Sequence, residues 1–165
     1  MALQLTQKEK QLLQDQITHE EVCIKKYQQG AQQASDPKLK QLFQSYAQQE
    51  QQHLTTINSI LSGRVPLMNQ SGQQGQQAQS QQSATQNKAS AQASGSSPAA
   101  SQADAALCQD MLMTEKYVSG AYDTAIFEFT DTNVRQALNH IQKEEQEHGE
   151  GISSYLQSNG MYNVQ

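Results

Sequence analysis

Apolar side chains recur at alternating three- and four-residue steps in four segments of this chain. This spacing places them on one face of an α-helix, as expected for helices that pack together in a bundle. The predicted inward positions, segment by segment, are Leu13, Ile17, Glu20, Ile24, Tyr27 and Ala31; Leu39, Phe43, Tyr46, Glu50, His53, Ile57 and Ile60; Cys108, Leu112, Glu115, Ser119, Tyr122, Ile126 and Phe129; and Val134, Leu138, Ile141, Glu145, His148, Ile152 and Tyr155. The pattern therefore predicts an all-α protein.

Turn and cap residues divide the four segments into two helical hairpins, residues 1–62 and 107–165. Ser35-Asp36-Pro37 offers an N-cap followed by proline at the first helical position, and Thr130-Asp131 can serve in the same way. Gly63 and Gly160 fall where the second helix of each hairpin should end.

Residues 63–106 have a different composition. From about Asn69 to Ala106 the chain consists mainly of Gln, Ser, Gly and Ala, and Lys88 and Asp104 are its only charged residues. Such a segment cannot bury enough apolar surface to offset the entropy lost on ordering. We therefore predict a disordered linker over residues 63–106.

The two hairpins are related by an internal duplication. Residues 12–61 align with residues 107–156 at a constant offset of 95, without gaps, and thirteen of the fifty pairs are identical. A two-fold relation between the hairpins requires a connection along the whole bundle, roughly 40 Å for helices of this length. A flexible linker of about forty residues can span that distance. We predict one domain, a ferritin-like four-helix bundle with a long crossover linker.

Six polar residues interrupt the apolar stripes near the middle of each helix. They are Glu20, Glu50, His53, Glu115, Glu145 and His148, and the duplication maps the first three onto the last three. The glutamate of each helix is about fifteen residues from the turn of its hairpin, or about 22 Å along the helix axis. All six are therefore expected at one level of the bundle.

Four carboxylates in an apolar core would repel one another and lose hydration. Two divalent cations would cancel their charge, and the two imidazoles would complete the coordination. One Glu from each of two helices and Glu-x-x-His from each of the other two is the di-iron or di-manganese pattern of ferritin-like bundles. We thus predict two ions of iron or manganese, which share these ligands. The alternative is an ordinary bundle in which these groups are solvated or hydrogen-bonded and bind no metal.

Other ionisable residues near the pattern lie off the stripes. Glu21 could replace Glu20, and Glu144 or Glu147 could replace Glu145, but each lies about 100° or more away around its helix. We interpret all three as exposed charges. His19 and His140 are interpreted as solvent-facing.

Tyr27 and Tyr122 follow Glu20 and Glu115 by two turns on the same face. A core role is the simpler interpretation, and a hydrogen bond to the metal ligands or a redox role is the alternative. Cys23 and Cys108 are too few for a disulfide framework and are predicted to be small buried residues.

Length and charge narrow the range of functions. The chain has 165 residues and a net charge of −5. Without a long basic block, nucleic acid is not an expected partner. No apolar run approaches the roughly 20 residues of a membrane helix, and MALQLTQKEK lacks the core of a signal peptide. We expect a cytosolic protein without a membrane partner, and a homo-oligomer is compatible with the sequence.

The second hairpin resembles the Coat F family of bacterial spore coat proteins. The resemblance rests on MLMTEKYVSGAYDTAIFEF, on NHIQKEEQEHGE and on the closing Gly160-Met161-Tyr162, within residues 107–162. It implies synthesis in the mother cell, deposition in the spore coat and other coat proteins as partners.

Three functions fit these observations. The first is a structural or protective coat protein that carries the metal site. The second is a di-metal oxidoreductase acting on peroxide or oxygen, similar to manganese catalases, rubrerythrins or ferroxidases, with Glu50 and Glu145 bridging or terminating the metals. The third is an interaction module cross-linked through its glutamine side chains.

Overall fold

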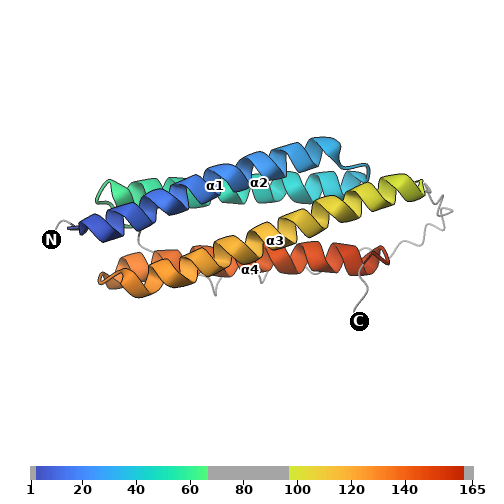
Figure 1. Cartoon of the computed structure of the whole chain (residues 1–165). Coiled ribbons are helices and arrows are strands. Elements are labelled where there is room, and N and C mark those ends of the chain that lie inside the picture. The colour runs from blue at the N-terminus through green and yellow to red at the C-terminus, as the bar shows by residue number, and fades with distance from the viewer. Residues whose placement is uncertain (1–2, 67–96, 162–165) are drawn as a thin grey trace, which may run out of the picture.

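The computed structural model describes residues 3–66 and 97–161, and these residues form a bundle of four α-helices (Figure 1). The helices are α1 (Gln7–Gln33), α2 (Pro37–Leu61), α3 (Pro98–Glu128) and α4 (Thr132–Ser158). Helices α1 and α2 form one hairpin and α3 and α4 the other, while α1 also packs against α3 and α2 against α4. The predicted all-α bundle of two hairpins is confirmed.

The helix ends lie where their capping residues predict. The Asp36 side chain accepts a hydrogen bond from the Lys38 amide, and Asp131 accepts one from the Asn133 amide, both at 2.8 Å. These contacts satisfy amides that have no partner within the helix. Gly63 and Gly160 have φ of +83° and +65°, a conformation that other residues rarely adopt.

The start of α3 corrects the predicted extent of the linker. Residues 67–96 of the expected linker lie outside the described residues, but α3 begins at Pro98, within the range assigned to disorder. The Ser97 hydroxyl accepts a hydrogen bond from the Ala100 amide at 3.3 Å, and proline occupies the first turn. This start signal and the alanines that follow favour a helix although the segment has little apolar surface.

Each hairpin turn is held by one buried acid of the opposite hairpin. Asp104 of α3 accepts hydrogen bonds from the amides of Ser35 and Asp36, at 2.8 and 2.9 Å. Glu9 of α1 accepts one from the Thr130 amide at 3.2 Å. An offset of 95 relates both members of these contacts, since Glu9 maps onto Asp104 and Ser35 maps onto Thr130. The two-fold relation predicted from the duplication is thus present in the packing.

The apolar core forms two clusters, one toward each end of the bundle. Leu13, Ile57, Ile60, Val134 and Leu138 are fully buried in the first cluster. The second cluster contains Leu39, Phe43, Met111, Ile152 and Leu156. The level between them carries the buried polar residues described below.

The predicted inward stripe of α3 is partly wrong. Leu112, Ser119 and Ile126 are only half-buried, and Met111, Val118 and Ala125, one residue earlier in each case, are buried instead. Tyr46 of α2 and Tyr155 of α4 are also half-buried. In α3 the neighbouring residues, such as Met111 and Leu112, form two adjacent stripes that both satisfy helical spacing. Packing against α1 and α4 decides which stripe faces inward.

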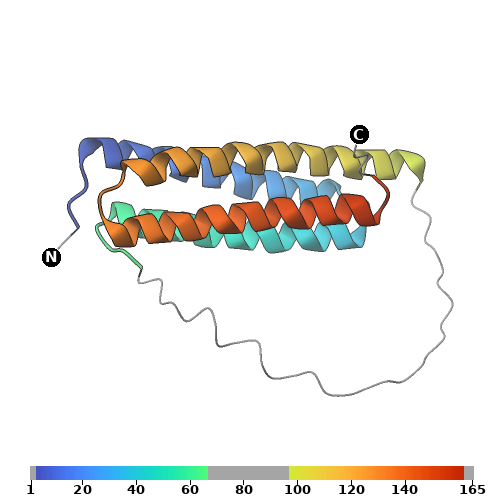
Figure 2. The ribbon, with the colours of Figure 1, turned by 90° about the horizontal axis from the view of Figure 1, so that it is seen from below.

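The described ends of the two hairpins lie far apart. Residue 66 follows α2 at one end of the bundle, whereas α3 starts at the other end (Figures 1 and 2). The described residues on either side of the linker thus lie at opposite ends of the bundle, as the duplication predicts.

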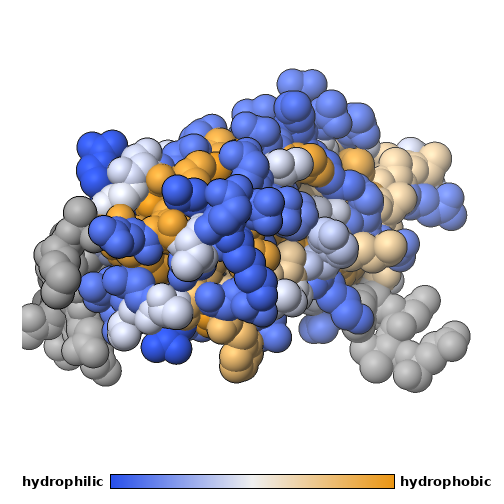
Figure 3. Space-filling model, turned by 60° about the vertical axis from the view of Figure 1, so that its left-hand side comes forward, coloured by the Kyte–Doolittle hydropathy of each residue, from blue (hydrophilic) through white to orange (hydrophobic). Residues whose placement is uncertain are grey.

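The outer surface is largely polar. The face in Figure 3 is mostly hydrophilic, with hydrophobic residues in small separate areas. Large exposed apolar side chains include Met113, Tyr117 and Phe127. Among the described residues, no helix is both long enough and apolar enough to cross a membrane.

Candidate metal centre

All six residues singled out in the sequence meet at one level of the bundle. Glu20 comes from α1, Glu50 and His53 from α2, Glu115 from α3, and Glu145 and His148 from α4; each is at most 3% exposed. Each helix contributes its central turn, because these residues continue the same inward stripe as the apolar core. The bundle therefore surrounds four carboxyl groups and two imidazoles with apolar packing.

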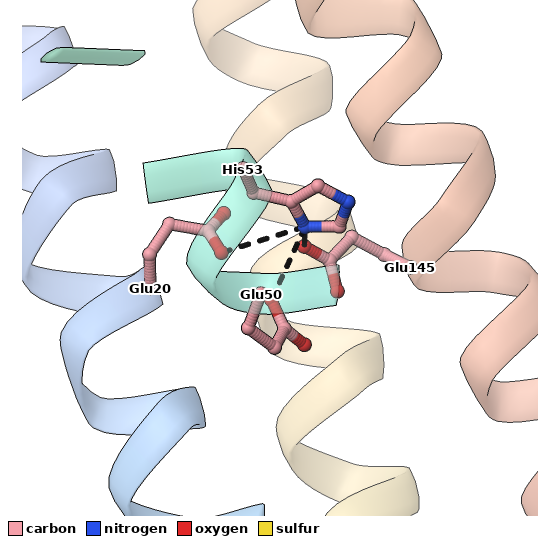
Figure 4. Close-up of side chains that lie close together, drawn as sticks. All are labelled: Glu20, Glu50, His53 and Glu145. Atoms are coloured by element: carbon pink, nitrogen blue, oxygen red, sulfur yellow. Dashed lines mark hydrogen bonds and ion pairs between the residues drawn. The ribbon is translucent and has the colours of Figure 1, made fainter. Parts of the chain in front are cut away.

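The first half of the cluster is centred on His53. Its Nδ1 lies 3.5 Å from Glu20 Oε2, 3.2 Å from Glu50 Oε2 and 3.2 Å from Glu145 Oε1 (Figure 4). The three carboxylates come from three different helices and point toward the same nitrogen.

The second half is centred on His148 in an equivalent way. Its Nδ1 lies 3.2 Å from Glu50 Oε1, 3.5 Å from Glu115 Oε1 and 3.7 Å from Glu145 Oε2. Glu50 and Glu145 therefore each turn one oxygen toward His53 and the other toward His148. The two imidazole rings are stacked, with 5.9 Å between their centroids.

The potential ligand atoms form two groups that share two carboxylates. Glu20, Glu50, His53 and Glu145 offer atoms that all lie within 4.8 Å of one another, and so do Glu50, Glu115, Glu145 and His148. Several of these atoms are buried without a hydrogen-bond partner, namely Glu20 Oε2, Glu50 Oε1, Glu115 Oε2, both oxygens of Glu145 and His148 Nδ1. Orphaned buried atoms are costly unless something else satisfies them. A pair of divalent cations at the two groups would do so.

The crowding of charge shifts the pKa values of the cluster. Burial disfavours a charged His148, but the close carboxylates around it, Glu115 first, raise its pKa to about 11. Burial raises the pKa of Glu115 to about 9, although the contact with His148 opposes this. Burial acts in the same sense on Glu145, yet the nearby imidazoles of both histidines hold its pKa well below the usual range. Without metal the centre therefore holds protons at His148 and Glu115 at neutral pH, while Glu145 is ionised.

Two tyrosines support the terminal carboxylates from across the bundle. The Tyr27 hydroxyl donates a hydrogen bond to Glu115 Oε1, and the Tyr122 hydroxyl donates one to Glu20 Oε1. Both tyrosines are fully buried. The structure thus combines the two interpretations made from the sequence, because each ring packs in the core and each hydroxyl contacts a carboxylate of the centre. These contacts leave the second oxygen of Glu20 and of Glu115 unpartnered.

Two side chains that we did not predict orient the histidines from outside. His53 Nε2 lies 2.8 Å from Glu144 Oε2, and His148 Nε2 lies 2.6 Å from Gln49 Oε1. A proton on each Nε2 satisfies these acceptors and leaves Nδ1 to face the carboxylates. The prediction that Glu144 is an exposed charge is wrong, since the residue is half-buried against His53. The duplication carried the missing signal: Gln49 and Glu144 are paired by the offset of 95, and each precedes a predicted ligand.

The remaining off-stripe residues lie away from the centre. Glu21 and Glu147 are exposed, as predicted. His140 is exposed, also as predicted, with its Nε2 3.5 Å from Glu144 Oε2. His19 is half-buried rather than solvent-facing, because its ring packs edge-on against Tyr117.

The surroundings of the two histidines are not identical. The Tyr46 ring lies over the imidazole of His148, with 4.2 Å between centroids, whereas the offset of 95 places Ile141 at the corresponding position. Cys23 and Cys108 are buried free cysteines, as predicted. Burial and the nearby carboxylates raise the pKa of the Cys23 thiol, so it stays protonated.

Comparison with known proteins supports the expected fold and resemblance. Residues 103–165 match the Coat F domain. The chain is also similar to a crystal structure of a two-domain protein from Anabaena variabilis that contains DJ-1/ThiJ/PfpI-like and ferritin-like domains. That similarity has a TM-score of 0.65 at 15% identity and covers 95% of this chain and 38% of the other. No curated protein matches the chain. The fold is a ferritin-like four-helix bundle, and the Coat F match covers its second hairpin.

Proposed function

We propose that this chain is a spore coat protein whose bundle binds two divalent metal ions, iron or manganese, in a protective or structural role. The observation that carries the metal site is the pair of ligand groups that share Glu50 and Glu145. The Coat F match supports the place of action, with other coat proteins as partners.

The proposed ligand assignment follows the directions of the side chains. Glu20 and His53 are terminal ligands of one ion, and Glu115 and His148 are terminal ligands of the other. One carboxylate oxygen of Glu50 faces each histidine. The same holds for Glu145. These two residues are therefore the bridging ligands.

Charge and donor type favour this class of metal. Four carboxylates balance the charge of two divalent ions, so the loaded centre adds no net charge to the apolar core. Imidazole and carboxylate donors suit iron and manganese, whereas a copper or structural zinc site would favour thiolates or a different geometry. The free cysteines take no part in either ligand group.

Metal content is the first test of the proposal. The full-length protein is purified from cells supplied with iron or with manganese, and bound metal is measured. We expect two ions per chain, and a large loss in Glu50→Ala. Glu147→Ala also removes one carboxylate, an exposed one on α4 next to His148, and serves as the control for the loss of a negative charge. Trace metal in the purified protein, together with no uptake on reconstitution, would contradict the proposal.

The second candidate function is a di-metal oxidoreductase acting on peroxide or oxygen. The specific observation in its favour is the small ligand set: each group offers one imidazole and three carboxylates, two of them shared. An iron or manganese pair held by these residues would supply two-electron chemistry on an O–O bond, and so small a ligand set would leave room for an external ligand. The residues of this chain would position the ions, exclude bulk water through the two apolar clusters and accept or release protons at His148 and Glu115.

Peroxide consumption by the loaded protein tests the second candidate. Metal-loaded wild-type protein should consume peroxide, and Glu50→Ala and His148→Ala should not. If the protein binds two ions per chain but turns over neither peroxide nor oxygen, the oxidoreductase function is rejected. The coat-protein function then remains.

A further inference from the structure

A groove between α3 and α4 reaches two side chains of the proposed metal centre. Its volume is about 420 Å³. Glu115 and Glu145 contribute to its lining, together with Ser119, Gly149 and Lys116. Glu115 is a terminal ligand and Glu145 a bridging ligand in the assignment above. The groove therefore ends at two side chains of the centre, whose carboxylate oxygens are themselves buried.

The duplication shows what closes the corresponding position of the other hairpin. With the offset of 95, Ser119 corresponds to Ile24 and Gly149 corresponds to Leu54. Ile24 is buried and Leu54 is half-buried beside the first ligand group. Ile24 and Leu54 thus place large aliphatic side chains on the α1–α2 side. At the same positions the α3–α4 side has only the hydroxyl group of Ser119 and the hydrogen atom of Gly149.

A larger groove on the α1–α2 side does not reach the centre. It has a volume of about 640 Å³ and is lined by residues such as Gln28, Gln44 and Gln48. None of the six ligands contributes to its lining. Of these two grooves, only the one between α3 and α4 is lined by side chains of the proposed centre.

Gly149 has no packing reason to be glycine. A Cβ built at this position meets only Leu112 Cδ2, at 3.9 Å, which is an ordinary contact. Glycine leaves this space unfilled, although alanine would be more favourable within a helix. By contrast, a Cβ at Gly30 would come within 2.8 Å of the Phe43 ring. Gly149 therefore lines the groove without filling it.

The charge at the mouth suits a neutral or anionic ligand. Lys116 is exposed at the groove, and its counterpart on α1 is Glu21. A cation at this position repels metal ions and attracts small anions. The second hairpin therefore differs from the first in its charge at this position as well as in its smaller side chains.

We propose that the groove between α3 and α4, held open by Ser119 and Gly149, is the entrance through which a small oxygen species such as peroxide or dioxygen reaches the metal pair at the Glu115–His148 position. The inference rests on the proposed di-metal site. It identifies Gly149 and Ser119 as residues that control access rather than ligands.

Azide is the probe for the test, because it is a small anion that binds open iron positions and changes their absorption. Iron-loaded, oxidised full-length protein is mixed with azide in a stopped-flow instrument. Gly149→Leu introduces the residue of the other hairpin into the groove. Gly120→Leu is the matched control, since a Cβ at this neighbouring helical glycine contacts nothing within 4 Å.

Gly149→Leu should slow azide association at least about tenfold, because the path rather than the binding position is altered. Dissociation should slow as well, so that azide affinity changes less than either rate. Gly149→Ala should give an intermediate rate, and Gly120→Leu the wild-type rate. Neither leucine variant should lower the iron content or the melting temperature.

The possible failures are distinguishable. Fully loaded Gly149→Leu with wild-type azide kinetics would overturn the entrance and leave the di-metal site intact. Wild-type protein that takes up no iron would overturn the di-metal proposal and this inference with it.

Discussion

Glu50 and Glu145 are the residues on which both halves of the centre depend. Each directs one oxygen toward His53 and the other toward His148, at 3.2–3.7 Å from the Nδ1 atoms. The outer contacts of the two histidines differ, however, because Glu144 is a carboxylate and Gln49 is an amide. A carboxylate makes the imidazole that it contacts more basic, and so a better metal ligand. The two ion positions are therefore chemically unequal.

Glu144→Gln should weaken metal binding, because it replaces the carboxylate at His53 by the amide that the other histidine already has. We expect about 10–100-fold lower affinity for one of the two ions, as measured by titration against a competing chelator. Gln49→Glu is the reciprocal control and should strengthen the other position. Unchanged affinities in both variants would show that these contacts only fill space.

Metal-free protein should lose stability as the pH rises above neutral. The folded pKa of His148, about 11, lies above its ordinary value of 6.5, so its contribution is complete below 6.5 and is lost as the pH approaches 11. The folded pKa of Glu115, about 9, also lies above its ordinary value, 4.5, and gives the same sign. The melting temperature without metal should thus fall between about pH 7 and about pH 10.

Bound metal replaces these protons, so loaded protein should show a much smaller change over the same range. The uptake of metal near neutral pH should release protons, which a weakly buffered titration with a pH indicator detects. Uptake without proton release would contradict the protonation states inferred for His148 and Glu115.

At the scale of the helices, apolar spacing predicted α1, α2 and α4 with few errors. In α3 it chose the wrong member of several neighbouring pairs, such as Leu112 instead of Met111, because both satisfy helical spacing. The first turns of α3 were missed because their alanines and serines bury little apolar surface. Asp104 contributes there through backbone contacts to the other hairpin, which no local pattern reveals.

Asp104→Ala should destabilise the bundle, because it leaves the amides of Ser35 and Asp36 without their acceptor. We expect a loss of about 1–3 kcal/mol in the free energy of unfolding, measured with a chemical denaturant. Asp110→Ala on the same helix is the matched control, since the Asp110 carboxylate is mostly exposed and its contact with Lys26 should contribute less than about 1 kcal/mol. Equal losses in both variants would show that Asp104 has no special part in holding the turn.

At the scale of the whole molecule, the duplication explains both what the two hairpins share and where they differ. The ligands, their tyrosines and the acids at the turns are repeated in each half. The offset of 95 made the six ligands predictable from the sequence, because it placed two sets of three at one level. Contacts between the hairpins, such as that of Glu144 with His53, depend on how α2 and α4 pack, so spacing within one helix could not predict them. The two outer seams differ as well, since only the α3–α4 side carries Ser119 and Gly149.

The most direct test is anomalous diffraction from crystals of iron-loaded or manganese-loaded protein. Two anomalous peaks are expected, about 3.5–4 Å apart, with Glu50 and Glu145 between them. One peak should adjoin Glu20 and His53, and the other Glu115 and His148. A single peak, peaks elsewhere on the chain or no peak at this level in loaded crystals would contradict the di-metal centre.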